Sequence, residues 1–268
     1  MSVDATRLGA LAPIVARKQR EAADLRCAAG TLWAKAESMP PARGFVAALR
    51  GGTVVAEMKR RSPSGGTLRG ALDPAAVARG YADAGATALS VLTDGPDFGG
   101  SLDDLVAARG AADIPVLRKD FTVDPIQVAE ARVAGADAVL LIVAVLDDDT
   151  LTACLDAARR CGLDALVEVH DETEARRAVD AGAACIGVNN RDLRTLRTDL
   201  ATFARVRSGI PHDVVCVAES GVRDEADVHR LVADGADAVL VGETLMRSGD
   251  PGAACAALVR AAREAAAR

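Results

Sequence analysis

The sequence is poor in the residue types that several functional classes need. Only three of its 268 residues are histidines, and aromatic side chains make up 2% of the chain. So few aromatic rings leave little material for stacking nucleic-acid bases. The net charge of −6 gives no basic excess for binding a phosphate backbone. We therefore expect no nucleic-acid partner.

The spacing of the six cysteines argues against a zinc-binding protein. None of them forms a CxxC pair, and with so few histidines the sequence gives no support for a zinc site. We expect small buried cysteines in a reducing compartment. The chain has neither an apolar run of about 18 residues nor an apolar leader at its start. These absences predict a cytoplasmic protein with no membrane partner and no metal.

What the chain does have is an internal repeat. Four segments of similar pattern are centred on Gly85, Gly135, Gly182 and Gly235, and each glycine follows a helical stretch and precedes an apolar run. Glycine suits the end of a helix, where the backbone turns to positive φ. A spacing of 50, 47 and 53 residues fits two strand–helix units, so four repeats predict eight units.

Eight short apolar runs supply the strands of these units. They are rich in Val, Ile and Leu, as strands buried on both faces of a parallel sheet are. Eight alternating units favour a (β/α)8 TIM barrel over an open doubly wound sheet, which gives no reason for fourfold repetition. The predicted strands are Thr53–Lys59, Ala88–Thr93, Val116–Asp120, Ala138–Ala144, Ala165–Val169, Cys185–Asn189, Val214–Glu219 and Ala238–Gly242.

Helix starts and an N-terminal extension complete the predicted architecture. Asp73, Asp124 and Asp250 each precede a proline, which is a typical N-cap followed by the first helical residue. Helical spacing over Val3–Leu25 predicts an extra helix packed on the barrel, and Gly30–Arg43 a connector. We therefore expect an N-terminal helical extension over residues 1–45 and a catalytic barrel over residues 46–268.

Polar side chains follow the strands at their carboxyl ends, where such barrels carry their chemistry. Glu57 and Lys59 stand two residues apart, so they point to the same side of the first strand. Charged groups are costly to bury unless they pair, so we expect them to meet around one mouth with Lys119, Glu168, Asn189, Arg191 and Glu219. We expect the histidines (His170, His212 and His229) to be structural or solvated.

Small residues after the last two strands predict a phosphate site. Ser220-Gly221 and Gly242-Glu243 allow backbone N–H groups to approach an anion, and Thr244–Arg247 predicts a short helix aimed there. Ser62 adds a hydroxyl, while the carboxylate of Glu243 must point away from a bound dianion. Phe98 and Phe121 are expected in loops above the barrel, where they would cover an aromatic ligand.

The chain resembles the indole-3-glycerol phosphate synthase family in six segments, in order and at suitable spacing: AEMKRRSPS, VLRKDF, LVEVH, IGVNNRDL, AESGV and LVGETLM. The match spans all eight strands. The resemblance implies a lyase of tryptophan biosynthesis that closes a ring and releases carbon dioxide and water. Its anionic sugar-phosphate substrate would be 1-(2-carboxyphenylamino)-1-deoxyribulose 5-phosphate and its product indole-3-glycerol phosphate, with no metal or organic cofactor.

The resemblance also implies a role for each matched residue. Lys119 would protonate the carbonyl oxygen during ring closure. Lys59 would bind the anthranilate carboxylate and is the alternative acid for dehydration. Glu168 would stabilise positive charge on nitrogen or take a proton, Glu57 would hold Lys59, and Glu219 would support the lysines. Asn189 would bind a substrate hydroxyl and Arg191 would orient the carboxylate side of the substrate.

The resemblance also implies which residues would hold the two ends of the substrate. The phosphate would be bound by Ser62, Ser220, Gly221, Gly242 and the backbone of Glu243. The aromatic ring would be surrounded by Phe98, Phe121 and Leu193.

Two alternatives remain at this point, and neither requires a different fold. A phosphoribosylanthranilate isomerase-like barrel would need an acid–base pair such as Cys and Asp, and the first strand offers no cysteine. A non-catalytic sugar-phosphate sensor would not need the two lysines to converge. The chain departs from the family pattern at Gly65, where a lysine is common, and at Pro96-Asp97, but no matched catalytic position is lost. We expect a monomer.

Overall fold

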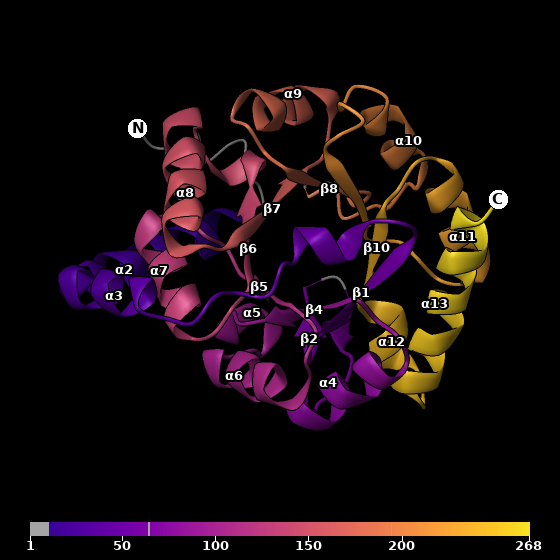
Figure 1. Ribbon diagram of the computed structural model, residues 1–268, viewed down its shortest axis with the longest axis horizontal. Helices are drawn as coiled ribbons and strands as arrows, with labels where there is room; N and C mark the ends of the chain where they lie inside the picture. Colours follow the sequence, from indigo (N-terminus) through magenta and orange to yellow (C-terminus); the bar gives the residue numbers. More distant parts are fainter. Residues whose placement is uncertain (1–10, 64, 194) are drawn as a thin grey trace.

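The chain folds into a closed barrel of eight parallel strands ringed by helices, as the repeat predicts (Figure 1). The computed structural model describes residues 11–63, 65–193 and 195–268. Around the barrel the strands follow the order β1–β10–β9–β8–β7–β6–β5–β4. They are β1 Thr53–Met58, β4 Ala88–Leu92, β5 Val116–Lys119, β6 Ala138–Ile142, β7 Asp164–Val169, β8 Cys185–Asn189, β9 Val215–Glu219 and β10 Ala238–Val241.

The predicted strands agree closely with the observed ones. Their ends differ by at most two residues, and the largest difference is at β6, where a 3-10 turn, η3 (Val143–Val145), replaces the end of the predicted strand. Nearly all strand residues are buried, because the barrel interior covers one face and the helices cover the other. The continuous apolar runs in the sequence reflect this double burial.

The four repeat glycines end helices in the left-handed region, as their pattern predicts. The φ angles of Gly85, Gly135, Gly182 and Gly235 are +89°, +91°, +79° and +96°. Each glycine follows the C-cap residue of its helix and turns the chain toward the next strand. A side chain with a Cβ would strain this backbone, so the repeat marks the turn from helix to strand in every second unit.

Helices cover the outside of the barrel, and the predicted aspartate caps are present. The side chain of Asp73 accepts hydrogen bonds from backbone N–H groups of the first helical turn, and Asp124 and Asp250 do the same. The helices after β1 are α4 Pro74–Asp83, α5 Gly95–Phe98, α6 Leu102–Ala111, α7 Pro125–Val133, α8 Asp148–Cys161, α9 Glu172–Asp180, α10 Ala201–Arg207, α11 Glu225–Ala233, α12 Glu243–Arg247 and α13 Pro251–Ala266.

In the described part of the N-terminal extension, two helices lie beside α7, at the left of Figure 1. The first, α2, spans Ala12–Arg26, and the part of the predicted helix that falls on residues 3–10 lies outside the described residues. The predicted connector Gly30–Arg43 was partly wrong, because Ala29–Glu37 forms a second helix, α3. Its alanines favour a helix strongly enough to tolerate Gly30, and the irregular segment follows this helix.

One end of the barrel is closed by a 3-10 turn, η2 (Val46–Leu49), which packs against β1 and β9. Phe45 and Leu49 are fully buried there, and the backbone N–H of Val46 donates to Asp164 at 2.8 Å. The loops that follow the strands surround the opposite end, which is where the predicted site residues stand. Within the described ranges, no helix has both the length and the apolarity needed to cross a membrane.

The cysteines are free thiols, and five of the six are buried. The exception is Cys27, which is exposed directly after α2, so the expectation of burial was wrong at this position. It stands on a short link between two surface helices, where no barrel element covers it. The sequence pattern around Cys27 is not that of an apolar strand, and it is the strands that bury Cys185 and Cys216.

Candidate active site

A cavity of about 730 Å³ opens at the carboxyl ends of the strands. Every site residue selected from the sequence lines it, from Glu57 and Lys59 on β1 and its loop to Gly242 and Glu243 after β10. Residues far apart in the chain meet here because parallel strands all end at the same rim of the barrel. The cavity therefore collects the predicted side chains, and their contacts show how they are arranged.

Lys119, the last residue of β5, lies at the centre of these contacts. Its Nζ is 2.7 Å from Oε2 of Glu168 on β7 and 2.6 Å from Oε2 of Glu219 on β9. An ammonium group has three N–H donors, and two of them are used by these carboxylates. The contacts in the described part of the chain therefore leave one donor of Lys119 for a bound molecule.

Glu57 on β1 and Lys59, directly after this strand, form a second contact between charged groups, as their spacing predicts. Nζ of Lys59 donates to Oε1 of Glu57 at 2.7 Å, and the hydroxyl of Ser90 donates to Oε2 at 3.1 Å. Glu57 is buried with 3% of its surface exposed. A Cβ on Gly242 would lie 2.5 Å from Oε1 of Glu57, so this glycine makes room for the carboxylate.

The charges in the mouth are set by burial and by these partners. Burial opposes the charged form of Lys119, but Glu168 and Glu219 outweigh it and raise the pKa of the ammonium well above its usual range. Burial likewise opposes ionisation of Glu57, yet Lys59 and Lys119 lower its pKa overall. At neutral pH the mouth thus presents a protonated Lys119 beside an ionised Glu57.

The two carboxylates that share Lys119 differ in their proton affinity. Burial opposes ionisation of Glu168, but Lys119 and His170 outweigh it and lower its pKa well below its usual range. For Glu219, burial and the nearby charge of Glu168 outweigh Lys119 and raise the pKa to about 7. Such a separation is the usual way for one site to hold both a proton acceptor and a proton donor.

His170 is a neighbour of Glu168 that the sequence analysis assigned a structural or solvated role. Its Nε2 lies 3.4 Å from Oε1 of Glu168, and its Nδ1 lies 3.0 Å from Oε2 of Glu174. Burial opposes its charged form, but the neighbouring carboxylates of Glu168 and Glu174 outweigh it and raise the pKa to about 10. Asn189 donates to the same oxygen of Glu168 at 3.1 Å. The spacing Glu168–His170 on one strand is the signal that could have identified this contact.

The rim after β9 and β10 carries the predicted phosphate residues. Ser220 and Gly221 both have positive φ, at +63° and +89°. A Cβ on Gly221 would lie 2.5 Å from the methyl carbon of Thr198, so only glycine fits. The predicted short helix is present as α12, one residue longer than expected, and begins at Glu243.

The carboxylate of Glu243 contacts two arginines, Arg247 and Arg191. Its Oε1 accepts from Nε of Arg247 at 3.0 Å, and its Oε2 lies 3.6 Å from a guanidinium nitrogen of Arg191. The hydroxyl of Ser62 accepts from the backbone N–H of Gly65 at 3.0 Å, and a hydroxyl that accepts one hydrogen bond can also donate its own proton. Glu243 is therefore paired with cations, and Arg191 lies on the same side of the mouth as Glu243.

An apolar wall faces these polar groups. The rings of Phe98 and Phe121 have centroids 6.2 Å apart and are tilted by 40°. Phe98 lies at the end of the short helix α5, not in a loop as expected. Leu11 and Ile14, from the N-terminal extension, line the same wall. Leu11 and Ile14 were not predicted to line the site, because helical spacing alone does not say which neighbour a helix face contacts.

No group of three or more His, Cys, Asp or Glu side chains among residues 11–63, 65–193 and 195–268 is arranged to hold a metal ion. The cavity instead combines ammonium groups, carboxylates and arginines with an apolar wall. This set of groups suits an anionic organic ligand that carries an aromatic ring.

Comparison with known proteins identifies the family. The model of indole-3-glycerol phosphate synthase matches residues 11–258. The chain belongs to this family. It is 56% identical over 230 residues to an indole-3-glycerol phosphate synthase from Mycobacterium ulcerans (strain Agy99), covering 85% of each chain. It is 54% identical over 236 residues to one from Parafrankia sp. (strain EAN1pec), covering 87% of this chain and 88% of that protein.

Membership of the indole-3-glycerol phosphate synthase family fixes the class of activity. The chain is an enzyme of tryptophan biosynthesis, a decarboxylating carbon–carbon lyase whose substrate is a sugar-phosphate derivative. More distant structures share only the barrel. A thiamine phosphate pyrophosphorylase from Pyrococcus furiosus superimposes with a TM-score of 0.62 at 17% identity, covering 81% of this chain and 98% of that one.

Proposed function

We propose that the mouth of the barrel converts 1-(2-carboxyphenylamino)-1-deoxyribulose 5-phosphate into indole-3-glycerol phosphate, with Lys119 as the acid for ring closure. The observation that carries this proposal is the Lys119 ammonium, held by Glu168 and Glu219 in a cavity that is also lined by the aromatic side chains and the candidate phosphate residues. Ring closure requires a proton donor at the substrate carbonyl, and the third N–H of Lys119 supplies one.

The first step forms a carbon–carbon bond between the ring carbon that carries the carboxylate and the carbonyl carbon of the sugar. The carbonyl oxygen takes a proton from Lys119 and becomes a hydroxyl, while positive charge develops on nitrogen. The ionised carboxylate of Glu168 stabilises that charge, as an anion placed before the reaction does. Asn189, which donates to Glu168, holds a substrate hydroxyl and keeps the carboxylate in place.

The next steps release carbon dioxide and water. Breaking the bond to the carboxylate returns electrons to the positively charged ring and gives a hydroxylated indoline. Loss of that hydroxyl as water then needs an acid, and loss of a ring proton needs a base. Lys59 is placed for the acid role in this dehydration, and Glu168 or Glu57 for the base role.

Lys59 also suits the binding of the anthranilate carboxylate. Within the described chain its ammonium has one carboxylate partner, Glu57, and so keeps two N–H donors for an anion. Arg191 lies near Glu243 and orients the anionic substrate from the other side. Glu219 supports Lys119 directly, and its pKa near 7 allows it to exchange a proton with the lysine during the cycle.

The ends of the substrate are held by different parts of the rim. Backbone N–H groups around Ser220, Gly221 and Gly242, the start of α12 at Glu243 and the hydroxyl of Ser62 bind the phosphate. Phe98, Phe121 and Leu193 surround the aromatic ring. We also propose that the chain acts as a monomer, because the large apolar side chains exposed in the described residues, Val106 on α6 and Leu196 in the loop between β8 and α10, lie in separate parts of the chain.

The test is to add the substrate to purified protein without added metal and to follow indole fluorescence. An increase in indole fluorescence that occurs only when the protein is present supports the proposed reaction. Phosphoribosylanthranilate, offered in a parallel assay, should not be isomerised, and its conversion would favour the isomerase alternative. A bound substrate that is never turned over would contradict the proposal and favour a sugar-phosphate sensor.

A further inference from the structure

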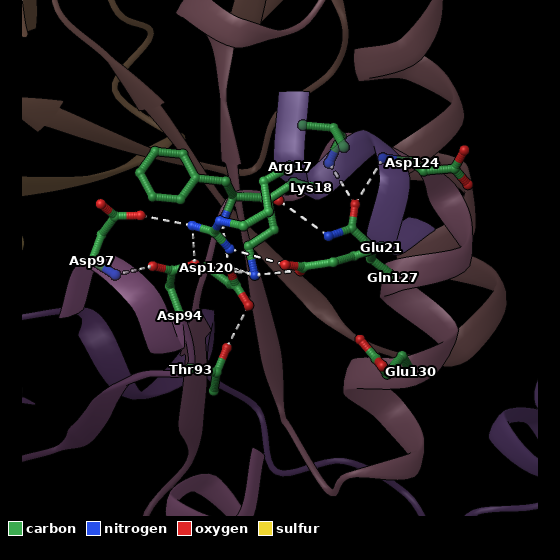
Figure 2. Close-up of polar contacts among 12 residues, drawn as sticks. Arg17, Lys18, Glu21, Thr93, Asp94, Asp97, Asp120, Asp124, Gln127 and Glu130 are labelled. Atoms are coloured by element: carbon green, nitrogen blue, oxygen red, sulfur yellow. Dashed lines mark hydrogen bonds and ion pairs between the residues drawn. The ribbon is translucent and has the colours of Figure 1, made fainter. Parts of the chain in front are cut away.

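Two adjacent cations on the N-terminal helix α2, Arg17 and Lys18, point toward the loops that carry the aromatic wall (Figure 2). The side chain of Lys18 is 5% exposed. Its Nζ lies 2.8 Å from Oδ1 of Asp120, 3.0 Å from Oε2 of Glu21 and 3.4 Å from Oδ1 of Asp94. Lys18 therefore connects the N-terminal extension to residues at the ends of β4 and β5.

Asp120 transmits this contact to the backbone of Phe121. One of its carboxylate oxygens, which faces Lys18, accepts the backbone N–H of Phe121 at 2.8 Å. The other oxygen accepts from the hydroxyl of Thr93 at 2.7 Å and from Arg118 at 3.1 Å. The position of Phe121 thus depends on a carboxylate that is fixed on both oxygens, and Lys18 is the partner that comes from outside the barrel.

Arg17 makes the equivalent contacts to the short helix α5, which ends at Phe98. One guanidinium nitrogen lies 2.8 Å from Asp94 and 2.7 Å from Asp97. Asp94 is fully buried and caps α5, accepting the backbone N–H of Asp97 at 3.1 Å. Phe98 is the next residue and the last of this helix. Arg17 and Lys18 therefore contact Asp94 and Asp120, the two carboxylates that fix the backbone at or beside Phe98 and Phe121.

Lys18 and Asp120 each favour the charged form of the other. Burial opposes the charged form of Lys18, but Asp120 and Asp94 outweigh it and raise its pKa. Burial opposes ionisation of Asp120, but Arg118 and Lys18 outweigh it and lower its pKa. Buried ion pairs add little to stability compared with apolar packing. They have a larger effect on where the paired side chains lie, because moving one member would leave a buried charge without its partner.

We propose that Arg17 and Lys18 are positioning residues for the aromatic end of the substrate, acting through Asp94 and Asp120 on Phe98 and Phe121. The inference rests on the proposed function and adds to it that the N-terminal extension controls recognition of the aromatic ring. Ile14 of the same helix and Leu11, its N-cap residue, also line the cavity. The candidate phosphate residues lie after β9 and β10, apart from Ser62 after β1, and the ion pairs of Arg17 and Lys18 in the described chain reach none of them.

The test compares two ligands that share a phosphate and differ in the aromatic ring. Dissociation constants for indole-3-glycerol phosphate and glycerol 3-phosphate are measured by calorimetry on the full chain and on Lys18→Met. The variant should bind indole-3-glycerol phosphate about tenfold more weakly, because the aromatic contact is misplaced. Its affinity for glycerol 3-phosphate should not change. Arg20→Met, on an exposed position of the same helix, is the matched control and should alter neither affinity.

Further variants separate positioning from folding. Lys18→Arg retains the charge and should restore most of the affinity for indole-3-glycerol phosphate. Arg17→Met removes a side chain that is 20% exposed and tolerates substitution better, so it provides the same comparison if Lys18→Met fails to fold. Equal losses for both ligands, or no loss for either, in the folded variant would overturn the inference.

The outcomes also distinguish this inference from the proposed function. If the unmodified protein does not convert the substrate, the proposed reaction fails whatever Lys18 does. If it converts the substrate and the folded Lys18→Met retains both the KM and the preference for the aromatic ligand, only the positioning role fails. A raised KM with a smaller change in kcat, together with the selective loss of aromatic binding, supports the role.

Discussion

Gly187 on β8 leaves space for the carboxylate of Glu219 on the neighbouring strand β9. A Cβ at Gly187 would lie 2.0 Å from Oε1 of Glu219, a distance at which the two atoms cannot coexist. The other carboxylate oxygen of Glu219 contacts Lys119 at 2.6 Å. A glycine inside the barrel thus determines where one partner of the proposed acid is held, although it carries no chemical group itself.

We expect Gly187→Ala to reduce kcat by about a hundredfold, since displacing Glu219 shifts Lys119 from its position. Overpacking should lower the free energy of unfolding by about 1–3 kcal/mol. Steady-state kinetics and urea unfolding measure the two effects separately. Gly30→Ala is the matched control, because a Cβ there meets no atom within 4 Å. An unchanged kcat in a folded Gly187→Ala would show that the position of Glu219 is unimportant.

Lys59→Met tests the proposed contact with the anthranilate carboxylate. Losing a charge-assisted hydrogen bond should raise KM by about tenfold to a hundredfold. If Lys59 is also the acid for dehydration, kcat should fall and the hydroxylated indoline should accumulate, which quenched-flow analysis of the products detects. Normal KM and kcat together would remove Lys59 from the mechanism.

His170→Gln tests the charge beside Glu168, because glutamine retains an N–H donor but not the positive charge. The pKa of His170 is raised from 6.5 to about 10. Its stabilising effect is therefore complete below pH 6.5 and is lost as the pH rises toward 10. The advantage of the unmodified protein over His170→Gln in free energy of unfolding should fall across this window, by up to about 1.4 kcal/mol per pH unit. A constant difference between pH 6 and 10 would mean that His170 is neutral.

The strands and most of the rim could be predicted because they depend on local patterns. Apolar runs such as Cys185–Asn189 must be strands buried on both faces, and the repeat glycines mark the turns between helix and strand. Once the barrel is recognised, residues that end its strands must lie at one rim. This is why Lys119 and Glu219 could be placed near each other, although 100 positions separate them in the sequence.

Other features depend on contacts that no local pattern contains. The role of Gly187 arises from the register of β8 against β9, which pairs it with Val217 and places Glu219 diagonally across from it. Lys18 has the spacing of an ordinary helix residue, and its burial depends on how α2 docks beside α7. The interpretation of His170 rested on its neighbours in the sequence, whereas its contacts with Glu168 and Glu174 depend on the folded structure.

The most direct measurement is a single-turnover experiment on Lys119→Met, with protein in excess over substrate and indole fluorescence as the signal. The account predicts that the rate of indole formation falls at least about a hundredfold, while glycerol 3-phosphate binds as tightly as to the unmodified protein. Lys35→Met, at an exposed lysine on α3, should retain the full rate. Indole formation at an undiminished rate in Lys119→Met would contradict the assignment of Lys119 as the acid for ring closure.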